Sequence, residues 1–378
     1  MNNLINAIAP STILLSLIFS TGINQVSAGN LPTKTKNNQQ FSLLLTQKSE
    51  TEEQIWYNKG VALTKLGKNQ EAIASFDQAI KIKPDFADAW YNKGVALGKL
   101  GKNQEAISSY DQAIKIKPDL YQAWNNKGIA LGNLGKYQEA IASFDQTIKF
   151  KPDEPEAWNN KGIALGKLGK NQEAIAFFDQ AVKFKPDYHE AWYNRGNALG
   201  ELGKHQEAIA SFDQTIKFKP DYADAWSNKG GALMNLGKNQ EAIASFDQAI
   251  KFKPDYADAW YNKGGALVNL GKYQEAIASF DQAIKFKPDE PEAWYNRGNA
   301  LGNLGKNQEA IASFDQAIKI KPDYASAWMG RGFTYYLLRN KPQAISNLKT
   351  AAQLFKEQNR PQDAEKVMQF IQAIQNSN

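Results

Sequence analysis

The chain has 378 residues, a formal net charge of +6 and no cysteine, and 42% of its residues are hydrophobic. Because cysteine is absent, the chain has no disulfides, no thiolate metal ligands and no thiol nucleophile. The excess of positive charge is mild and spread along the chain, so it gives little support to nucleic-acid binding.

The N-terminal segment has the pattern of a secretory signal. An apolar stretch at residues 13–19 is followed at 26–28 by Val-Ser-Ala, which is close to a signal-peptidase site. Residues 1–28 are therefore predicted to be a signal peptide, although residues 1–12 hold no lysine or arginine. The alternatives are a membrane anchor formed by residues 1–28 and an apolar cytoplasmic tail. A cleaved signal predicts a periplasmic or secreted protein.

Beyond a mostly polar stretch at 29–52, which is predicted to be a linker, the sequence repeats itself. Its tryptophans are spaced by 34 residues, at Trp56, Trp90, Trp124, Trp158, Trp192, Trp226, Trp260, Trp294 and Trp328. This period is typical of stacked helix–turn–helix units, which cannot bury their apolar faces alone. The spacing thus predicts an all-α solenoid.

Residues 257–290 show how one unit is built. We number every unit from 1 to 34, so that Trp260 is at position 4. An apolar stripe at positions 4, 8, 11 and 14 predicts a first helix, and Gly271 at position 15 is expected to end it. A second stripe at positions 20, 21, 24, 27 and 28 predicts a second helix, which Pro288 ends.

Charged residues near the helix ends have structural explanations. Asp255, followed three residues later by Asp258, predicts a capping box at the start of the first helix. The recurrent lysines at positions 29 and 31, such as Lys285 and Lys287, lie at the end of the second helix, where the macrodipole favours cations. Position 7 is lysine or arginine in every unit, and the aspartate at position 25, Asp77 in the first unit, is its expected partner.

The motif resembles that of the tetratricopeptide repeat family, with Trp, Gly, Ala, Phe or Tyr, Ala and Pro at positions 4, 8, 20, 24, 27 and 32. Residues 53–324 hold eight such units, in which Thr147 and Thr215 replace alanine at position 27. The resemblance implies a right-handed α-solenoid whose first helices line a concave groove. Residues 325–358 are interpreted as a degenerate ninth repeat, and 359–378 as a capping helix and tail. The capping helix is expected to place on one face Ala364, Val367, Met368, Ile371 and Ile374.

The sequence shows no catalytic constellation. Only two histidines occur, His189 and His205, and there is no P-loop, HExxH or GxSxG motif. Other repeats place Ala, Tyr or Asn where these histidines stand, so both are expected to be surface residues. We predict that the protein is not an enzyme and uses no metal and no cofactor. Its expected partner is a protein or peptide, not nucleic acid, and a membrane only if residues 1–28 stay uncleaved.

Position 6 of the first helix predicts peptide binding. It is asparagine in every full repeat, at Asn58, Asn92, Asn126, Asn160, Asn194, Asn228, Asn262 and Asn296. An amide carries both a donor and an acceptor, so a row of amides suits the backbone of an extended polypeptide. The row resembles the asparagine ladder in the repeat domain of O-linked N-acetylglucosamine transferases, whose catalytic domain has no counterpart here. Alternatively, the asparagines tie neighbouring helices together or reflect recent copying of one unit.

Tyrosines at position 5 stand beside this row and offer contact area at low entropic cost, at Tyr57, Tyr91, Tyr193, Tyr261 and Tyr295. Positions 2, 5, 6, 9, 12 and 13 share one helix face, here called the groove face. The sequence varies most at positions 5, 9, 12 and 13, with some variation at 17 and 34. The carboxylate clamp of chaperone adaptors is not expected, because its basic residues at positions 2 and 6 are missing.

The expected function is non-catalytic binding of an extended polypeptide along the groove, in support of complex assembly. One alternative is a structural or membrane-tethered scaffold that binds through its outer face. Another is a targeting subunit for a separate glycosyltransferase chain. An ordered peptide in the groove would favour the first function, whereas binding that survives loss of the groove residues would favour the second.

Overall fold

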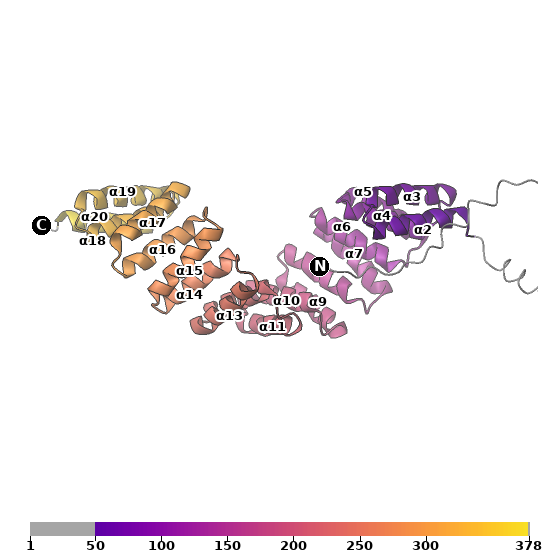
Figure 1. Ribbon diagram of the computed structural model, residues 1–378, viewed down its shortest axis with the longest axis horizontal. Helices are drawn as coiled ribbons and strands as arrows, with labels where there is room; N and C mark the ends of the chain where they lie inside the picture. Colours follow the sequence, from indigo (N-terminus) through magenta and orange to yellow (C-terminus); the bar gives the residue numbers. More distant parts are fainter. Residues whose placement is uncertain (1–49, 377–378) are drawn as a thin grey trace, which may run out of the picture. The chain divides into compact units, whose positions relative to one another are not determined.

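The computed structural model of the protein describes residues 50–376, so the predicted signal and nearly all of the predicted linker lie outside the described residues. The described range is built from helices that follow one another in pairs (Figure 1). The first helices of the repeats are α2 (Glu52–Lys65), α4 (Ala87–Lys99), α6 (Tyr121–Asn133), α8 (Pro155–Lys167), α10 (His189–Glu201), α12 (Ala223–Asn235), α14 (Ala257–Asn269), α16 (Pro291–Asn303) and α18 (Ala325–Leu337). The second helices are α3 (Asn69–Ile82), α5 (Asn103–Ile116), α7 (Tyr137–Phe150), α9 (Asn171–Phe184), α11 (His205–Phe218), α13 (Asn239–Phe252), α15 (Tyr273–Phe286), α17 (Asn307–Ile320) and α19 (Lys341–Glu357). A further helix, α20 (Pro361–Asn376), follows α19.

The helices pack in chain order. Each helix contacts the next one along the chain, and each first helix also touches the first helix of the following repeat. This arrangement confirms the predicted all-α solenoid of helix–turn–helix repeats. Between residues 50 and 376, no helix combines the length and the apolar character that a membrane span requires.

Glycine at position 15 ends the first helix of each full repeat. Gly271 has a φ of 71°, in the left-handed region that glycine adopts without a Cβ clash. The amide N–H of Lys272 then donates to the carbonyl oxygen of Leu267 at 2.9 Å, which closes the helix in a Schellman arrangement. The predicted helix end is therefore confirmed. In the ninth repeat Arg339 takes this place and has a φ of 60°.

Small residues let the paired helices approach closely. A Cβ added to Gly264 would lie 2.6 Å from Cε1 of Phe280, so the glycine at position 8 is what admits the ring at position 24. Ala259 and Ala266, at positions 3 and 10, are completely buried. Leu270 at position 14 is 40% exposed, so its assignment to the apolar stripe was wrong. It is the C-cap residue of α14, one residue beyond the last helical turn.

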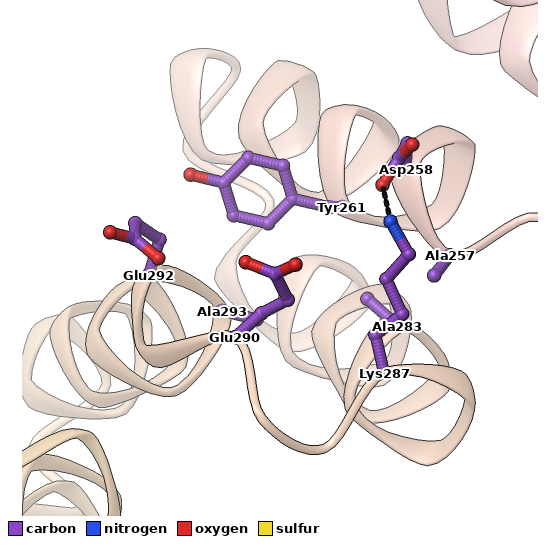
Figure 2. A pocket seen from close by; sticks show the side chains of 8 residues that line it. All are labelled: Ala257, Asp258, Tyr261, Ala283, Lys287, Glu290, Glu292 and Ala293. Carbon is purple, nitrogen blue, oxygen red and sulfur yellow. Dashed lines mark hydrogen bonds and ion pairs between the residues drawn. The ribbon is translucent and has the colours of Figure 1, made fainter. Parts of the chain in front are cut away.

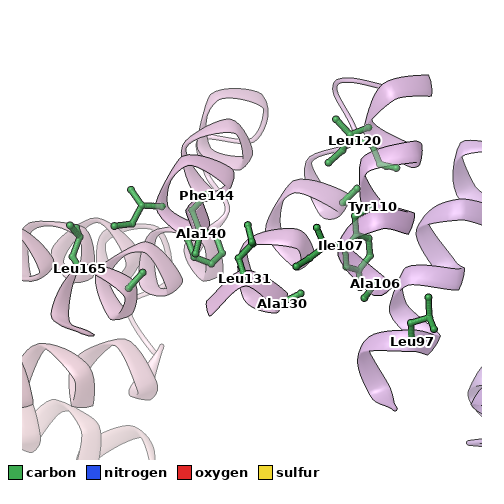
Figure 3. Close-up of a cluster of buried hydrophobic side chains, with 14 of the residues drawn as sticks. Leu97, Ala106, Ile107, Tyr110, Leu120, Ala130, Leu131, Ala140, Phe144 and Leu165 are labelled. Atoms are coloured by element: carbon green, nitrogen blue, oxygen red, sulfur yellow. The ribbon is translucent and has the colours of Figure 1, made fainter. Parts of the chain in front are cut away.

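The core continues from one repeat into the next. Figure 3 shows one stretch of it, in which side chains of α4 to α8 lie between the helices. Leu97 and Leu131 come from first helices, whereas Ile107 and Phe144 come from second helices, and all four belong to one buried cluster. Because no repeat encloses its own core, burial of the apolar side chains requires the neighbouring repeats.

The tryptophans are only partly buried. Trp192 packs beside the buried residues Ala181, Val182 and Ala191, and its indole N–H donates to the carbonyl oxygen of Pro186 at 2.9 Å. The same bond, from tryptophan to the proline six residues earlier, recurs along the chain. The tryptophan therefore ties the start of the first helix to the loop before it, in addition to its packing.

The predicted capping box was wrong. The N-cap residue of α14 is Tyr256, not Asp255, and no side chain accepts a hydrogen bond from this helix end. Asp255 lies one residue too early in the chain to act as the cap. The acidic residue in the first turn, Asp258, still lies where the helix dipole favours a negative charge.

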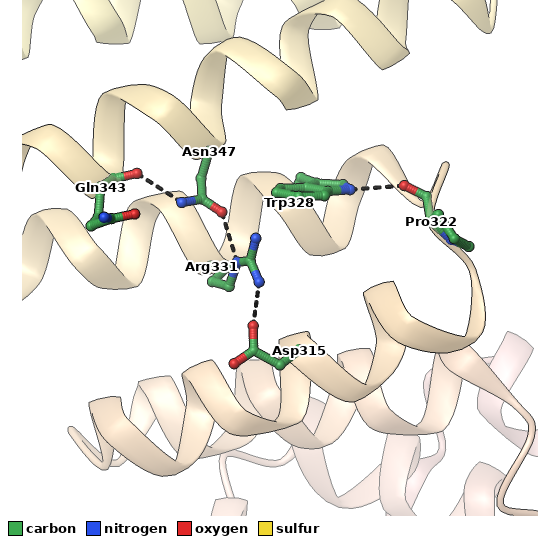
Figure 4. A network of polar contacts seen from close by, with 6 residues as sticks. All are labelled: Asp315, Pro322, Trp328, Arg331, Gln343 and Asn347. Atoms are coloured by element: carbon green, nitrogen blue, oxygen red, sulfur yellow. Dashed lines mark hydrogen bonds and ion pairs between the residues drawn. The ribbon is translucent and has the colours of Figure 1, made fainter.

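The predicted pairing of positions 7 and 25 is confirmed, and each pair joins a repeat to the one before it. The pairs are Lys93–Asp77, Lys127–Asp111, Lys161–Asp145, Arg195–Asp179, Lys229–Asp213, Lys263–Asp247, Arg297–Asp281 and Arg331–Asp315. Figure 4 shows the last of these, where Arg331 also donates from Nε to Oδ1 of Asn347 at 2.7 Å. Its guanidinium group lies over the ring of Trp328, 4.4 Å from the centroid.

Helix α20 packs on α19 and buries Ala364, Val367, Ile371 and Ile374, as predicted from the apolar pattern. Met368 was expected on the same face, but it is 38% exposed. Phe370 packs inward in part, and its ring stacks on Phe333 of α18 with centroids 5.3 Å apart. The buried face of α20 is therefore rotated toward Phe370 relative to the prediction.

Candidate functional site

Three hollows open on the groove face between first helices of consecutive repeats. The hollow between α6 and α8 measures ≈ 360 Å³ and is lined by Ile129 and Lys167 among others. Hollows of ≈ 520 Å³ lie between α10 and α12, beside Asn197, and between α16 and α18, beside Phe333. The same repeat positions 9, 12 and 13 contribute to all three, so the face presents a series of related depressions.

Glycine at position 12 leaves this space open. A Cβ built on Gly132, Gly200 or Gly302 meets no heavy atom within 4 Å, although all three glycines stand inside helices. A larger side chain would extend into the hollow that each one lines. At these three positions the wall of the hollow is therefore low.

The asparagines at position 6 bond to the preceding repeat. Nδ2 of Asn126 donates to the Tyr91 hydroxyl at 3.2 Å, and Nδ2 of Asn296 donates to the Tyr261 hydroxyl at 2.8 Å. The remaining pairs of this kind are Asn92–Tyr57, Asn160–Asn125, Asn194–Asn159 and Asn228–Tyr193. In each pair the asparagine at position 6 is the donor, so the carbonyl oxygen of that asparagine is not part of the bond. The alternative that asparagine ties neighbouring helices together therefore describes these six residues.

Two asparagines of the row differ from the others. Asn58 belongs to the first repeat and accepts a hydrogen bond from Nε2 of Gln54 at 3.0 Å. Asn262 follows a repeat whose position 5 is Ser227, where the other full repeats offer a tyrosine or an asparagine. Its side chain instead lines the hollow between α10 and α12.

The tyrosines at position 5 are half-buried between the groove face and the core. The ring of Tyr193 lies 6.1 Å from that of Phe212 in the same repeat and 4.9 Å from that of Tyr222 at position 34. Burial raises the pKa of Tyr57, Tyr91, Tyr193 and Tyr261 above the usual value of 10.0. Tyr295 lines the hollow between α16 and α18.

Some residues of this face were missed by sequence reasoning. Met329, Phe333 and Leu337 of the ninth repeat line the same hollow as Tyr295, and Phe333 and Leu337 are 47% and 50% exposed. The residue at position 34, which covers the ring at position 5, was also missed. The sequence signal that could have identified position 34 is its variation between repeats.

The two histidines do not form a common site. Nδ1 of His189 lies 3.1 Å from a carboxylate oxygen of Glu190, whereas His205 lines the hollow between α10 and α12. In the part of the chain that the structure describes, no three His, Asp or Glu side chains are placed to hold a metal ion.

Family models identify the repeats. Models described as tetratricopeptide repeat match residues 125–189, 193–257 and 228–291, and also 87–120 and 291–324. A model described as TPR repeat matches residues 60–101. With the fold described above, these matches show that the chain belongs to the tetratricopeptide repeat family. No curated protein matches it.

Solved structures with similar repeats include YrrB, described as a TPR protein with an unusual peptide-binding site. It is 24% identical over 50% of this chain and 97% of its own, with a TM-score of 0.44. MamA is 26% identical, covering 43% of this chain and 96% of its own, with a TM-score of 0.42. A tetratricopeptide repeat protein from Parabacteroides merdae is 19% identical, covering 66% and 98%, with a TM-score of 0.49.

Proposed function

We propose that the groove face binds an extended polypeptide without catalysis and that this binding supports the assembly of a protein complex. The main support is the series of hollows between consecutive first helices, each opened by glycine at position 12. A partner that spans several repeats meets related depressions one after another, so many modest contacts add along its length.

In this proposal the asparagine row serves both the solenoid and the partner. In six of the asparagines Nδ2 donates to the preceding repeat, which fixes the side chain on the groove face. The amide carbonyl oxygen, which these pairs do not use, then accepts from a backbone N–H of the partner. Fixing the amide beforehand lowers the entropic cost of binding. The resemblance of this asparagine row to the asparagine ladder of O-linked N-acetylglucosamine transferases stays a prediction.

The proposal is tested by filling the groove. In the purified chain, Gly132→Gln together with Gly200→Gln places a long side chain in two hollows, and the added Cβ meets no heavy atom within 4 Å. The matched control, Ala142→Gln together with Ala210→Gln, adds the same side chains at exposed sites of the second helices α7 and α11. Selection from a random-peptide display library should yield binders for the native chain and the control, and the groove variant should bind them at least about tenfold more weakly.

Equal binding of these peptides by the native chain and the groove variant would contradict the proposal. Loss of binding only in the control would move the site to the outer face, as the alternative scaffold function requires. Circular dichroism of both variants checks that the helices are intact.

A second pair of variants separates direct contact from repeat stability. Asn126→Ala with Asn296→Ala removes both the hydrogen bond to the preceding repeat and the carbonyl oxygen that this bond does not use. Tyr91→Phe with Tyr261→Phe removes only the two acceptors of these hydrogen bonds. If the asparagines contact the partner, the first pair weakens peptide binding much more than the second pair does.

We also propose that the protein works in a periplasm or outside the cell, based on the signal pattern in residues 1–28. N-terminal sequencing of the exported protein tests this, because cleavage after Ala28 gives a first residue of Gly29. A chain that stays attached to the membrane with Met1 intact would favour the anchor instead.

A further inference from the structure

Three junctions between repeats share one arrangement of aromatic rings. An aromatic residue at position 34 covers the tyrosine ring at position 5, with centroids 5.0 Å apart for Tyr57 and Phe86 and 5.2 Å for Tyr295 and Tyr324. The lysine at position 31 then lies over the covering ring. Its amine is 5.3 to 5.5 Å from the ring centroid in the pairs Lys83–Phe86, Lys219–Tyr222 and Lys321–Tyr324.

The junction between the seventh and eighth repeats differs from these three. Position 34 is Glu290, so no ring covers Tyr261, and a cavity of ≈ 250 Å³ lies there instead. Figure 2 shows the Tyr261 ring on one side of this cavity and the carboxylates of Glu290 and Glu292 near it. Three alanines, Ala257, Ala283 and Ala293, also line the cavity.

The cavity carries more negative than positive charge. Asp258, Glu290 and Glu292 line it together with a single cation, Lys287. The Lys287 amine bonds to Asp258 at 2.8 Å, and this bond raises the pKa of Lys287. Within residues 50–376, neither Glu290 nor Glu292 forms an ion pair. The lining therefore holds three carboxylates and one amine, and that amine is bonded to Asp258 and not to Glu290 or Glu292.

The start of helix α16 accounts for part of this charge but not for the cavity. Glu290 is the N-cap residue of α16 and Glu292 lies in its first turn, where the helix dipole favours anions. The dipole reduces the repulsion between them. It does not explain why the Tyr261 ring is left uncovered, which follows from the replacement of an aromatic residue by Glu290.

One other junction has glutamate at position 34, but it differs in the residue at position 5 and in the partner of the lysine at position 31. Glu154 stands there, but position 5 is Asn125, so no tyrosine ring is present. The lysine at position 31, Lys151, pairs with Asp153 at 2.9 Å. The combination of a tyrosine at position 5 with a glutamate at position 34 occurs only between the seventh and eighth repeats.

We propose that this cavity binds an arginine side chain of the extended polypeptide, an inference that rests on the function proposed above. A guanidinium group can lie against the Tyr261 ring and donate to the carboxylates of Glu290 and Glu292. Arginine suits the site better than lysine because its planar group combines stacking with paired donors. Groove-face residues Asp258, Tyr261 and Glu292 line the cavity, and its volume of ≈ 250 Å³ fits one side chain.

The test uses two short glycine–serine peptides that differ at one central residue, arginine or glutamine. The purified chain is labelled at its alanine methyl groups, because Ala257, Ala283 and Ala293 line the cavity and report on it directly. Titration followed by nuclear magnetic resonance should shift these methyl signals with the arginine peptide. The arginine peptide should bind about tenfold more tightly than the glutamine peptide, as one charge-assisted contact provides.

The main variant is Glu290→Tyr, which restores the residue that other junctions carry and is therefore compatible with folding. It should abolish the difference between the two peptides. The matched control, Glu154→Tyr, makes the same substitution where position 5 is asparagine and should leave the difference unchanged.

Equal affinity of the two peptides, a difference that survives Glu290→Tyr, or no shift of the three methyl signals at millimolar peptide would each overturn the arginine site. The methyl groups of Ala164 and Ala232 lie in the hollows of the groove and report on the proposed function separately. If display-selected peptides shift these signals while the cavity stays silent, the groove function stands and the arginine site fails.

Discussion

At the scale of single residues, the glycines at positions 8 and 12 of first helices such as α10 have opposite roles. The glycine at position 8 admits the aromatic ring at position 24, and its missing Cβ is a requirement of packing. The glycine at position 12 faces open space, so packing does not require it. Glycine inside a helix lowers stability by about 1 kcal/mol relative to alanine. Its presence at position 12 therefore fits a surface that keeps room for a partner.

This difference predicts opposite effects of the same substitution in α10. Gly200→Ala should raise the free energy of unfolding by about 0.5–1 kcal/mol, because the methyl group meets nothing within 4 Å and helix propensity improves. Gly196→Ala should lower it by about 1–3 kcal/mol, because the Cβ would lie 2.6 Å from Cε1 of Phe212. Urea unfolding measures both. If both variants are stabilised, the fit between Gly196 and Phe212 is not tight.

At the scale of helices, the ninth repeat departs from the others where it ends its first helix. Arg339 adopts the left-handed conformation that glycine holds in the eight preceding repeats. A side chain in this region costs about 1–2 kcal/mol, and nothing in the structure shows what offsets the cost. The following helix α19 is also longer than the other second helices, and α20 packs on it.

Relieving this conformation should stabilise the C-terminal end. Arg339→Gly should raise the stability of α18, α19 and α20 by about 0.5–1 kcal/mol, after allowance for the greater freedom of glycine in the unfolded chain. Hydrogen exchange of the three helices gives the local readout. The reverse change, Gly305→Arg after α16, should lower local stability by a similar amount. An unchanged exchange rate in both variants would contradict the assignment of strain to Arg339.

At the scale of the whole described range, the protein depends on contacts between neighbouring repeats. Each helix packs only near its neighbours in the chain, so stability is expected to add repeat by repeat. The ties are of several kinds: the shared core, the pairs between positions 7 and 25, and the bonds from asparagine to the preceding position 5. Single half-exposed ion pairs contribute about 0.2–1 kcal/mol, so the core contributes most.

The buried tyrosines predict loss of stability at high pH. Burial raises the pKa of Tyr188 and Tyr222 from 10.0 to about 12 in the folded chain. The unfolded chain ionises first, so the stabilising contribution is complete below pH 10 and is lost as pH rises toward 12. Urea unfolding should therefore show a midpoint that falls over this interval.

The variant Tyr188→Phe with Tyr222→Phe provides the control for this pH dependence. It removes two of the titrating groups, so its midpoint should fall less steeply between pH 10 and 12 than that of the native chain. Identical slopes, or a tyrosinate absorbance titration in which both residues ionise near 10 in the folded chain, would contradict the prediction.

The local sequence pattern was sufficient to predict the helices and several contacts between them. The 34-residue period places every helix pair, Gly271 marks a helix end, and the pairing of Lys93 with Asp77 follows from positions 7 and 25. Each of these depends on helix periodicity, on a backbone angle that glycine favours or on charge. Repetition made these signals reliable, because each is present in many copies.

Other features could not be predicted from one repeat. Leu270 looks like a core residue by spacing, yet it is the C-cap residue and 40% exposed. Asn126 looks available for a ligand, yet its Nδ2 is bound to Tyr91 in the preceding repeat. Burial and hydrogen bonding depend on which atoms of the next repeat are close, and periodicity does not contain that information.

The sequence by itself therefore determined the repeat, the helix pairs, the helix-ending glycines and the charge pairing, because these depend on residues within a turn or two of each other or on copies in register. Only the tertiary structure decided which groove amides are already bonded, where glycine leaves hollows and why Tyr261 lies open beside Glu290. These features arise where two repeats meet. There a single substitution at position 34 exchanges a covering ring for a charged cavity.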